Sequence, residues 1–287
     1  MPTDALRSGK MKLSIVGGPV AERFGERRAL EMIKAAGFDN VDYSLNTSSD
    51  KTYMLGDNYL DRARETRKIL SELSLGCYQT HAPFDFKYTD KMSLDNKAYR
   101  DVVRAIEYSS IIGAQVIVVH AIRVPADCDF LSFNLDYYRS LMPYGEKFGI
   151  KIAVENLVGS IFWTPDRLCS FIKMLNSDVF VACVDVGHSA IVGRPPEKYI
   201  EGMDKGILKC VHLHDTDLKE DKHWIPYLGN QNWDNIAKAL KEYGFDGDVE
   251  LEIIHSYDNL DYELMPCALE FAQKVGRHII KKIKGDI

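Results

Sequence analysis

Short apolar runs alternate with helical patterns along the whole sequence, and this alternation restricts the fold more than any other feature. The apolar runs are rich in valine and isoleucine and show little polar alternation, which is typical of strands covered on both faces. We predict strands at residues 12–16, 40–45, 77–82, 115–120, 151–156, 180–186, 208–214 and 248–254. Eight such strands separated by helices are typical of the α/β class and predict a single (β/α)8 TIM barrel.

The segments between these strands show apolar residues at helical spacing. We predict helices at residues 22–36, 59–73, 95–112, 131–148, 196–203, 232–243 and 264–284, and one more that begins at Thr164-Pro165-Asp166. The chain has 287 residues, and such a barrel needs about 250 residues. We therefore expect one domain over residues 1–287, with residues 1–10 as a flexible N-terminal extension.

Charge and apolar patterning exclude several classes of protein. The net charge is −6, which argues against nucleic acid as a partner because phosphate neutralisation needs clustered lysine and arginine. The first ten residues contain no apolar signal-peptide core, and no apolar run reaches the roughly 18 residues that a membrane span needs. The six cysteines show no CxxC spacing. These features predict a reduced, cytoplasmic enzyme that binds no membrane and could form a homo-oligomer.

Residue types that commonly bind metals stand at the ends of six consecutive predicted strands. They are His81, His120, Glu155, Asp185, His212 and Glu252. The carboxyl ends of parallel strands meet at one mouth of a barrel, so these side chains are expected to converge there. A single histidine in such a place is usually structural, but six consecutive strands with this ending favour a metal centre. The mixed nitrogen and oxygen donors suit Zn²⁺, Mn²⁺, Co²⁺ or Fe²⁺.

The ordered series of motifs around these residues resembles the xylose-isomerase-like barrels. That superfamily includes sugar and sugar-phosphate isomerases and epimerases, inosose dehydratases and endonuclease IV. The matching motifs cover nearly the whole chain and are Thr80-His81-Ala82-Pro83, Val119-His120, Val154-Glu155-Asn156, Val184-Asp185-Val186-Gly187-His188, His212-Leu213-His214-Asp215, Asp221-Lys222-His223 and Leu251-Glu252.

Similarity to the epimerase branch implies one divalent ion, with Mn²⁺, Zn²⁺, Co²⁺ and Mg²⁺ as candidates. Its ligands would be Glu155, Asp185, His212 and Glu252. The same resemblance implies that Glu155 and Glu252 are the catalytic residues that transfer protons, and that His188 contacts the substrate. His214 is two residues beyond His212 and shares its strand face, so it is expected to support the metal site.

Similarity to the endonuclease IV branch implies up to three zinc ions. His81 and His120 would join Glu155 on one ion, and His188 would join Asp221 and His223 on another. These residues are therefore candidates for further metal ligands or for substrate contacts.

The long loop over residues 216–231 follows the seventh predicted strand and is expected to have a functional role. It carries Asp221 and His223 beside Trp224. We expect Trp224 and Asn156 to line the substrate cavity. Ketohexose 3-epimerases usually carry an arginine shortly after the histidine of this strand, whereas Asp215-Thr216-Asp217-Leu218 contains none. This departure argues against ketohexose 3-epimerase specificity.

These features predict a metal-dependent isomerase or epimerase of a sugar, sugar phosphate or polyol. The reaction expected from the resemblance is proton transfer through a metal-bound enediolate. Three alternatives stay open at this point: an apurinic endonuclease of the endonuclease IV type, a dehydratase or lyase that acts on a cyclitol or glycoside, and a metal-bearing subunit of a hetero-complex.

Overall fold

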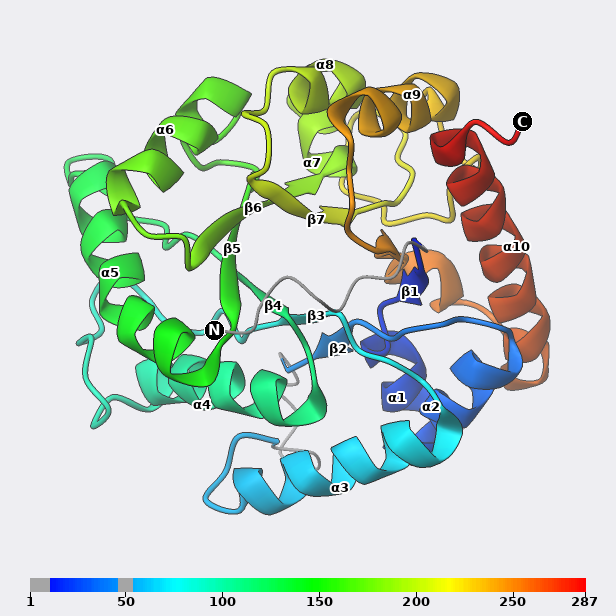
Figure 1. Cartoon of the computed structure of the whole chain (residues 1–287), viewed down its shortest axis with the longest axis horizontal. Helices are drawn as coiled ribbons and strands as arrows, with labels where there is room; N and C mark the ends of the chain where they lie inside the picture. The colour runs from blue at the N-terminus through cyan, green and yellow to red at the C-terminus, as the bar shows by residue number, and fades with distance from the viewer. Residues whose placement is uncertain (1–10, 46–53) are drawn as a thin grey trace.

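In the computed structural model of the chain, strands occupy the middle of the molecule and helices surround them (Figure 1). The structure describes residues 11–45 and 54–287, so the predicted N-terminal extension over residues 1–10 lies outside the described residues. Within the described residues the strands are β1 (Leu13–Ile15), β2 (Tyr43–Ser44), β3 (Gln79–His81), β4 (Val116–Val119), β5 (Lys151–Glu155), β6 (Phe180–Asp185), β7 (Leu208–His212) and β8 (Val249–Leu251).

All the strand pairings are parallel, as the alternation of strands and helices predicts. β1 pairs with β8, and β2 to β7 pair in sequence order. Isolated parallel bridges join Val16 to Asp42 and Leu213 to Leu251. Because these bridges link the two sheets at both seams, each strand has a neighbour on either side.

Helices follow the strands and cover their outer faces (Figure 1). Within the described residues they are α1 (Gly18–Phe24), α2 (Glu26–Ala35), α3 (Tyr59–Leu73), α4 (Lys97–Ile112), α5 (Phe130–Phe148), α6 (Pro165–Leu175), α7 (Val186–Ile191), α8 (Pro196–Glu201), α9 (Trp233–Tyr243) and α10 (Met265–Lys284), with 3-10 turns η2 (His255–Tyr257) and η3 (Tyr262–Leu264).

The predicted helix over residues 22–36 is wrong in one respect, because the structure contains two helices there. Gly25 separates α1 from α2 and has φ 78° and ψ 158°, a conformation that favours glycine and cannot continue a helix. The short helix α7 was also not predicted. It begins directly after β6, where the Asp185 side chain caps it by accepting a hydrogen bond from the backbone N–H of His188 at 2.7 Å.

Two apolar clusters make up the core. The larger one lies between the strands and the surrounding helices. The smaller one lies inside the ring of strands and consists of Tyr78, Val116, Val118, Ala153, Val181, Cys183 and Cys210. Side chains alternate between the two faces of a strand, so the residues two positions further along also point inward. Glu155, Asp185 and His212 take those positions and stand above the smaller cluster.

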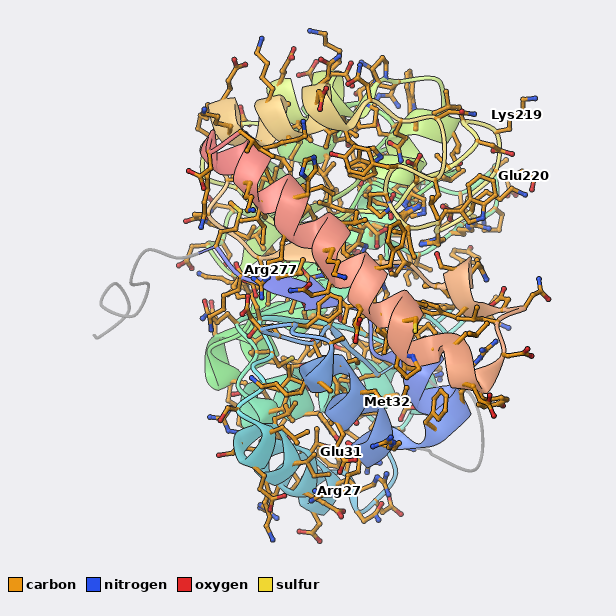
Figure 2. The ribbon with its side chains drawn as sticks, turned by 90° about the vertical axis from the view of Figure 1, so that its right-hand side faces the viewer. Arg27, Glu31, Met32, Lys219, Glu220 and Arg277 are labelled. Carbon is orange, nitrogen blue, oxygen red and sulfur yellow. The ribbon has the colours of Figure 1, made fainter. Side chains whose placement is uncertain are left out.

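Helix α10 is hydrogen-bonded to residues next to the first strand. The Arg277 guanidinium, visible on α10 in Figure 2, donates to the Asp39 carboxylate at 2.6 Å and to the backbone oxygen of Gly37 at 2.9 Å. Asp39 also accepts from the backbone N–H of Leu13 at 2.9 Å. These bonds hold α10 beside the first strand. No helix among residues 11–45 and 54–287 is long and apolar enough to cross a membrane.

Candidate metal and substrate site

Strand alternation brings the predicted site residues together at the carboxyl ends of the strands. Glu155 is the last residue of β5, Asp185 ends β6 and His212 ends β7. Glu252 follows β8 by one residue and lies two positions beyond the inward-facing Glu250. All three strand-terminal residues are buried. The tertiary fold therefore places their side chains over the interior cluster, as the sequence predicts.

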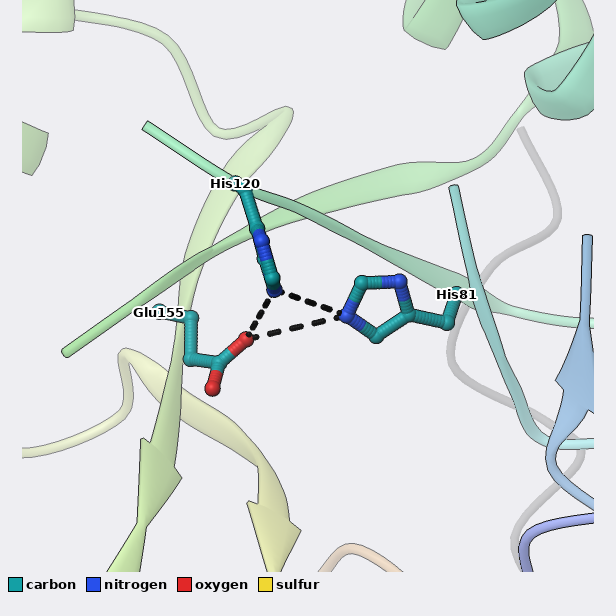
Figure 3. Close-up of side chains that lie close together, drawn as sticks. All are labelled: His81, His120 and Glu155. Atoms are coloured by element: carbon teal, nitrogen blue, oxygen red, sulfur yellow. Dashed lines mark hydrogen bonds and ion pairs between the residues drawn. The ribbon is translucent and has the colours of Figure 1, made fainter. Parts of the chain in front are cut away.

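The first group of facing side chains consists of His81, His120 and Glu155 (Figure 3). The two Nε2 atoms of the histidines lie 3.0 Å apart. Oε2 of Glu155 lies 3.0 Å from Nε2 of His120 and 3.8 Å from Nε2 of His81. Nδ1 of His81 lies 2.8 Å from the backbone oxygen of Ala82, to which a protonated Nδ1 donates. That tautomer leaves Nε2 of His81 with a lone pair that points at the other two residues.

The second group consists of Glu155, Asp185 and His212, and Glu252 lies beside it. Nδ1 of His212 lies 3.4 Å from Oε2 of Glu252, 3.6 Å from Oε1 of Glu155 and 3.9 Å from Oδ2 of Asp185. Three carboxylates thus surround one imidazole nitrogen. Such crowding of like charges is costly in a buried site unless a cation or protons compensate it.

The third group consists of His188, Asp221 and His223. Oδ2 of Asp221 lies 3.1 Å from Nε2 of His188 and 3.2 Å from Nε2 of His223. Nδ1 of His188 lies 3.1 Å from Oε1 of Glu155, so the third group adjoins the first two. Nδ1 of His223 lies 2.8 Å from the backbone oxygen of Glu252. The loop after β7 therefore reaches back over the end of β8.

His214 contacts the Asp185 carboxylate of the second group. Its Nε2 lies 3.0 Å and 3.1 Å from the two oxygens of Asp185, and its ring stacks on His223 with centroids 3.9 Å apart. A side chain at Gly187 would collide with the His214 ring, so this close approach requires glycine. His214 therefore holds the Asp185 carboxylate through hydrogen bonding.

The loop after β7 is held by the buried side chain of Asp215. Its two oxygens accept from the backbone N–H groups of Thr216, Tyr227 and Gln231 at 2.9, 2.9 and 3.1 Å. They also accept from Nε1 of Trp233 at 2.7 Å. One carboxylate thus anchors the start, the middle and the end of the loop. Lys219 and Glu220 project from this loop at the edge of the molecule (Figure 2).

The two glutamates of the site ionise differently. Burial opposes the ionisation of Glu155, but His120 and His212 outweigh burial and lower the pKa of Glu155 well below its ordinary value. Burial raises the pKa of Glu252 well above its ordinary value, and the carboxylates of Asp185 and Glu155 add to this effect. The surroundings of the two glutamates therefore shift their pKa values in opposite directions.

A cavity of about 610 Å³ opens over these groups. Glu155, His188 and Glu252 line it. The other members of the three groups that line it are His81, His120, Asp221 and His223. This volume is within the range of small-molecule sites. Neither Asn156 nor Trp224 is among the lining residues of this cavity. The Asn156 amide instead donates to the backbone oxygen of Asp185 at 2.9 Å and accepts from its N–H at 2.7 Å.

Sequence reasoning missed two buried acids beneath the site, Asp42 and Glu250. Each offers a carboxylate oxygen in a common group with His212. Burial raises the pKa of both carboxyls, and Asp42 accepts from Nε2 of Gln79 at 2.7 Å. Their positions could have been found from the strand period, because Glu250 precedes Glu252 by two residues and Asp42 interrupts an apolar run.

The residues present fit a divalent cation. Both ring nitrogens of His212 are buried and have no hydrogen-bond partner within the described part of the chain. An imidazole buried in this way is costly unless something else binds it. Glu155, Asp185 and His212 offer ligand atoms within 4.8 Å of one another. One imidazole with several carboxylates is a donor set that Zn²⁺ and Mn²⁺ accept.

Similar proteins share this fold over nearly the whole chain. A D-tagatose 3-epimerase-like protein superposes with a TM-score of 0.77 at 21% identity, over 96% of this chain and 99% of that one. The IolI protein, whose crystal structure contains a zinc atom, superposes with a TM-score of 0.76 at 18% identity, over 95% and 99%.

A sequence relative and a family match lead to the assignment. The uncharacterized protein MJ1311 of Methanocaldococcus jannaschii is 29% identical over 184 residues, which make up 60% of this chain. The match spans 62% of that relative's length. The family described as xylose isomerase-like TIM barrel matches residues 30–274. That match covers most of the chain and agrees with the parallel strands and their surrounding helices, so the chain belongs to the xylose isomerase-like TIM barrel family.

Proposed function

We propose that this protein is a metal-dependent isomerase or epimerase of a sugar, a sugar phosphate or a related polyol. The observation that carries the proposal is the group of three carboxylates around Nδ1 of His212, two of which, those of Glu155 and Glu252, line the cavity. The D-tagatose 3-epimerase-like neighbour supports a sugar as the substrate class, and the zinc atom in IolI supports a metal in such a barrel. The loop after β7 lacks the arginine expected of ketohexose 3-epimerases, so the proposal does not commit to a ketohexose.

Four residues would hold one divalent ion: Glu155, Asp185, His212 and Glu252. When bound, the ion would act as a Lewis acid that polarises a carbonyl oxygen and acidifies the neighbouring carbon. His214 and Asn156 would keep Asp185 in position, since they bind its side chain and its backbone respectively. The candidate ions remain Mn²⁺, Zn²⁺, Co²⁺ and Mg²⁺.

Proton transfer is assigned to Glu155 and Glu252. Their oxygens lie 3.6 and 3.4 Å from Nδ1 of His212, and both residues line the cavity, so a substrate carbon bound near them would be within reach of two carboxyl groups. One glutamate takes the proton from the carbon, and the other returns a proton on the opposite face. Each glutamate needs one oxygen that is not committed to the ion.

The other polar groups of the cavity would orient the substrate. His188 and Asp221 line the cavity and lie 3.1 Å from each other, so they can bind neighbouring hydroxyl groups of a polyol chain. Phe84, Val16 and Ile254 line the same cavity and reduce the access of water to the reacting carbon.

Turnover in D₂O with a panel of ketoses, ketose phosphates and inososes tests the proposal. We expect deuterium on the carbon next to the carbonyl of the product, because the returned proton comes from a group that exchanges with solvent. Glu252→Gln should reduce the rate by roughly 100-fold or more at an unchanged fold, whereas Glu146→Gln, an exposed matched control, should not. Product without solvent deuterium would point to a hydride shift and exclude the two-glutamate mechanism. Loss of water from an inosose would identify a dehydratase instead.

The two histidine-rich groups support a second candidate, an endonuclease of the endonuclease IV type. His81, His120 and Glu155 form one group, and His188, Asp221 and His223 form another, as a site for three ions requires. The net charge of −6 argues against this activity because a duplex-cleaving enzyme must neutralise phosphates. We expect one ion per chain and no binding to an abasic duplex at physiological ionic strength. Three ions per chain, together with salt-sensitive cleavage of the duplex, would reverse this ranking.

A further inference from the structure

Two cations at the mouth of the cavity are not used by the proposed chemistry. Lys87 follows β3 by six residues, and Arg123 follows β4 by four residues. Both side chains line the cavity that also contains His81 and His120. Neither Lys87 nor Arg123 forms an ion pair with any residue in the parts of the chain that the structure describes. Both side chains are exposed, and the carboxylates that line the same cavity are those of Asp42, Glu155, Asp221 and Glu252.

Hydrogen bonds to a buried side chain hold the backbone next to Arg123 in place. The preceding residue, Ile122, donates its N–H to Oδ1 of the buried Asn134 at 2.7 Å, and its backbone oxygen accepts from Nδ2 of Asn134 at 3.0 Å. The guanidinium of Arg123 donates to the backbone oxygen of Val158 at 3.4 Å across the mouth. The loop after β4 is thus pinned next to Arg123, which lies on the side of the cavity where His120 stands.

An apolar wall connects these cations to the proposed chemistry. The ring of Phe84 stacks on that of His120 with centroids 5.1 Å apart and an interplanar angle of 12°. Phe84 lies between His81 and Lys87 in sequence and lines the same cavity. A substrate whose reacting carbon lies near Glu155 could therefore extend along Phe84 and place its far end beside Lys87 and Arg123. The volume of about 610 Å³ accommodates a molecule of that size.

We propose that Lys87 and Arg123 form an anion subsite that binds an oxyanion group, a phosphate ester or a carboxylate, at the end of the sugar substrate remote from the reacting carbon. The subsite rests on the proposed function and narrows its substrate class to acidic sugars. Arginine presents several N–H donors to an oxyanion, and lysine adds a point charge. Because neither cation is paired with a carboxylate among the described residues, both can bind an oxyanion while the other end of the sugar lies near Glu155.

Equilibrium binding by titration calorimetry tests the subsite without requiring turnover. The probes are D-ribulose, D-ribulose 5-phosphate and a hexuronate, each added to the metal-loaded full chain. The variant is Lys87→Gln combined with Arg123→Gln. The matched control combines Lys91→Gln with Arg139→Gln, because Lys91 and Arg139 are exposed, lie outside the cavity, and Arg139 likewise donates to a backbone oxygen, that of Met174. Metal content and circular dichroism confirm that both variants are folded and loaded.

We expect the double variant to bind D-ribulose 5-phosphate roughly 10- to 100-fold more weakly, the range expected for loss of charge-assisted hydrogen bonds. Its affinity for D-ribulose and the affinities of the control should not change. The same selective loss with the hexuronate and not with the phosphate ester would assign a carboxylate to the subsite. Equal affinities of variant and wild type for both acidic probes, or an equal loss for D-ribulose, would overturn the proposal. Selective loss of binding without any isomerised or epimerised product from the wild type would support the subsite and contradict the proposed reaction.

Discussion

Asp185 holds several parts of the site together through one buried carboxylate. It caps α7 through the N–H of His188, it accepts from His214, and it lies 3.9 Å from Nδ1 of His212. Among the described residues, Asp185 contacts the third group only through His188. Asp221 and His223 are connected to it indirectly, because Oδ2 of Asp221 lies near both His188 and His223. The site therefore consists of the carboxylates around His212 and, beside them, the pair of histidines that Asp221 joins.

Asp185→Asn should lose most of the bound metal while the barrel still folds. The amide can still accept from the N–H of His188, but it carries no charge and binds a cation weakly. We expect the metal affinity to fall at least tenfold with an unchanged circular dichroism spectrum. Metal content after dialysis measures this, and Asp178→Asn, an exposed carboxylate bound to Lys151, is the control. Full occupancy in Asp185→Asn would remove this residue from the ligand set.

His223→Ala separates a substrate contact from a metal ligand. His223 lies 3.2 Å from the Asp221 carboxylate and 3.4 Å from the Glu252 carboxylate, but it is not one of the four proposed ligands of the ion. We therefore expect a loss of activity of about 10-fold or more at an unchanged content of a single ion, since a positioned polar contact is removed. His278→Ala on α10 serves as the control. Loss of a second or third ion would show that His223 is a metal ligand. Unchanged activity at an unchanged metal content would show that His223 has no role in binding or catalysis and that the loop only connects β7 to α9.

At the scale of elements, one buried carboxylate, that of Asp215, binds the loop over residues 216–231 at several points. Asp215 accepts hydrogen bonds from its start, middle and end and from Trp233 on α9. Gly229 lies so close to Asp215 that a side chain there would collide with the carboxylate. Hydrogen bonding to one buried acid therefore positions the loop, together with the apolar packing of Ile225 in the core.

Asp215→Asn should loosen this loop. The amide nitrogen cannot accept a hydrogen bond, so at least one pair of N–H groups is left without its acceptor in a buried place. We expect the free energy of unfolding to fall by about 1–3 kcal/mol, and limited proteolysis to cut faster within residues 217–231. Asp217→Asn tests the specificity of the effect, because Asp217 is exposed and binds only the local backbone. Equal proteolysis of Asp215→Asn and wild type would contradict the anchoring role.

At the scale of the whole molecule, hydrogen bonds through Asp39 connect helix α10 to strand β1. Asp39 joins Arg277 of α10 to the backbone N–H of Leu13. Burial raises the pKa of Asp39, but the hydrogen bonds from Arg277 and Leu13 outweigh it and leave the pKa below its ordinary value of 3.8. A lowered pKa means that the charged form of Asp39 stabilises the folded state above about pH 4, and that this stability is lost as the pH falls through the folded-state value.

Asp39→Asn should therefore destabilise the protein by about 1 kcal/mol at pH 7, a figure that allows for solvent screening of a partly exposed pair. The difference from wild type should shrink as the pH is lowered below about 4, because wild-type Asp39 then becomes protonated. Urea unfolding at several pH values measures this. Asp61→Asn, which breaks an exposed pair with Arg64, should change little at any pH. A difference that stays constant with pH would show that the charge of Asp39 is unimportant.

The sequence alone determined the class of fold and the side chains at the strand ends. Parallel strands covered on both faces need continuous apolar runs, and such runs can be read directly from the chain. The ends of these runs therefore identify Glu155, Asp185 and His212 without a structure. The break at Gly25 does not follow from the apolar spacing, which continues across it although the backbone leaves the helical conformation.

Only the tertiary structure decided which other side chains meet these residues. Glu250 lies in β8 and Asp42 directly precedes β2, and the strand period can indicate that both point inward. That both meet His212 depends on the pairing of neighbouring strands, which apolar spacing does not specify. Lys87, Arg123 and Trp224 lie in loops, whose directions follow from contacts with distant residues such as Asn134. Strand periodicity is a local property of the chain, whereas the composition of the cavity depends on contacts between segments far apart in sequence.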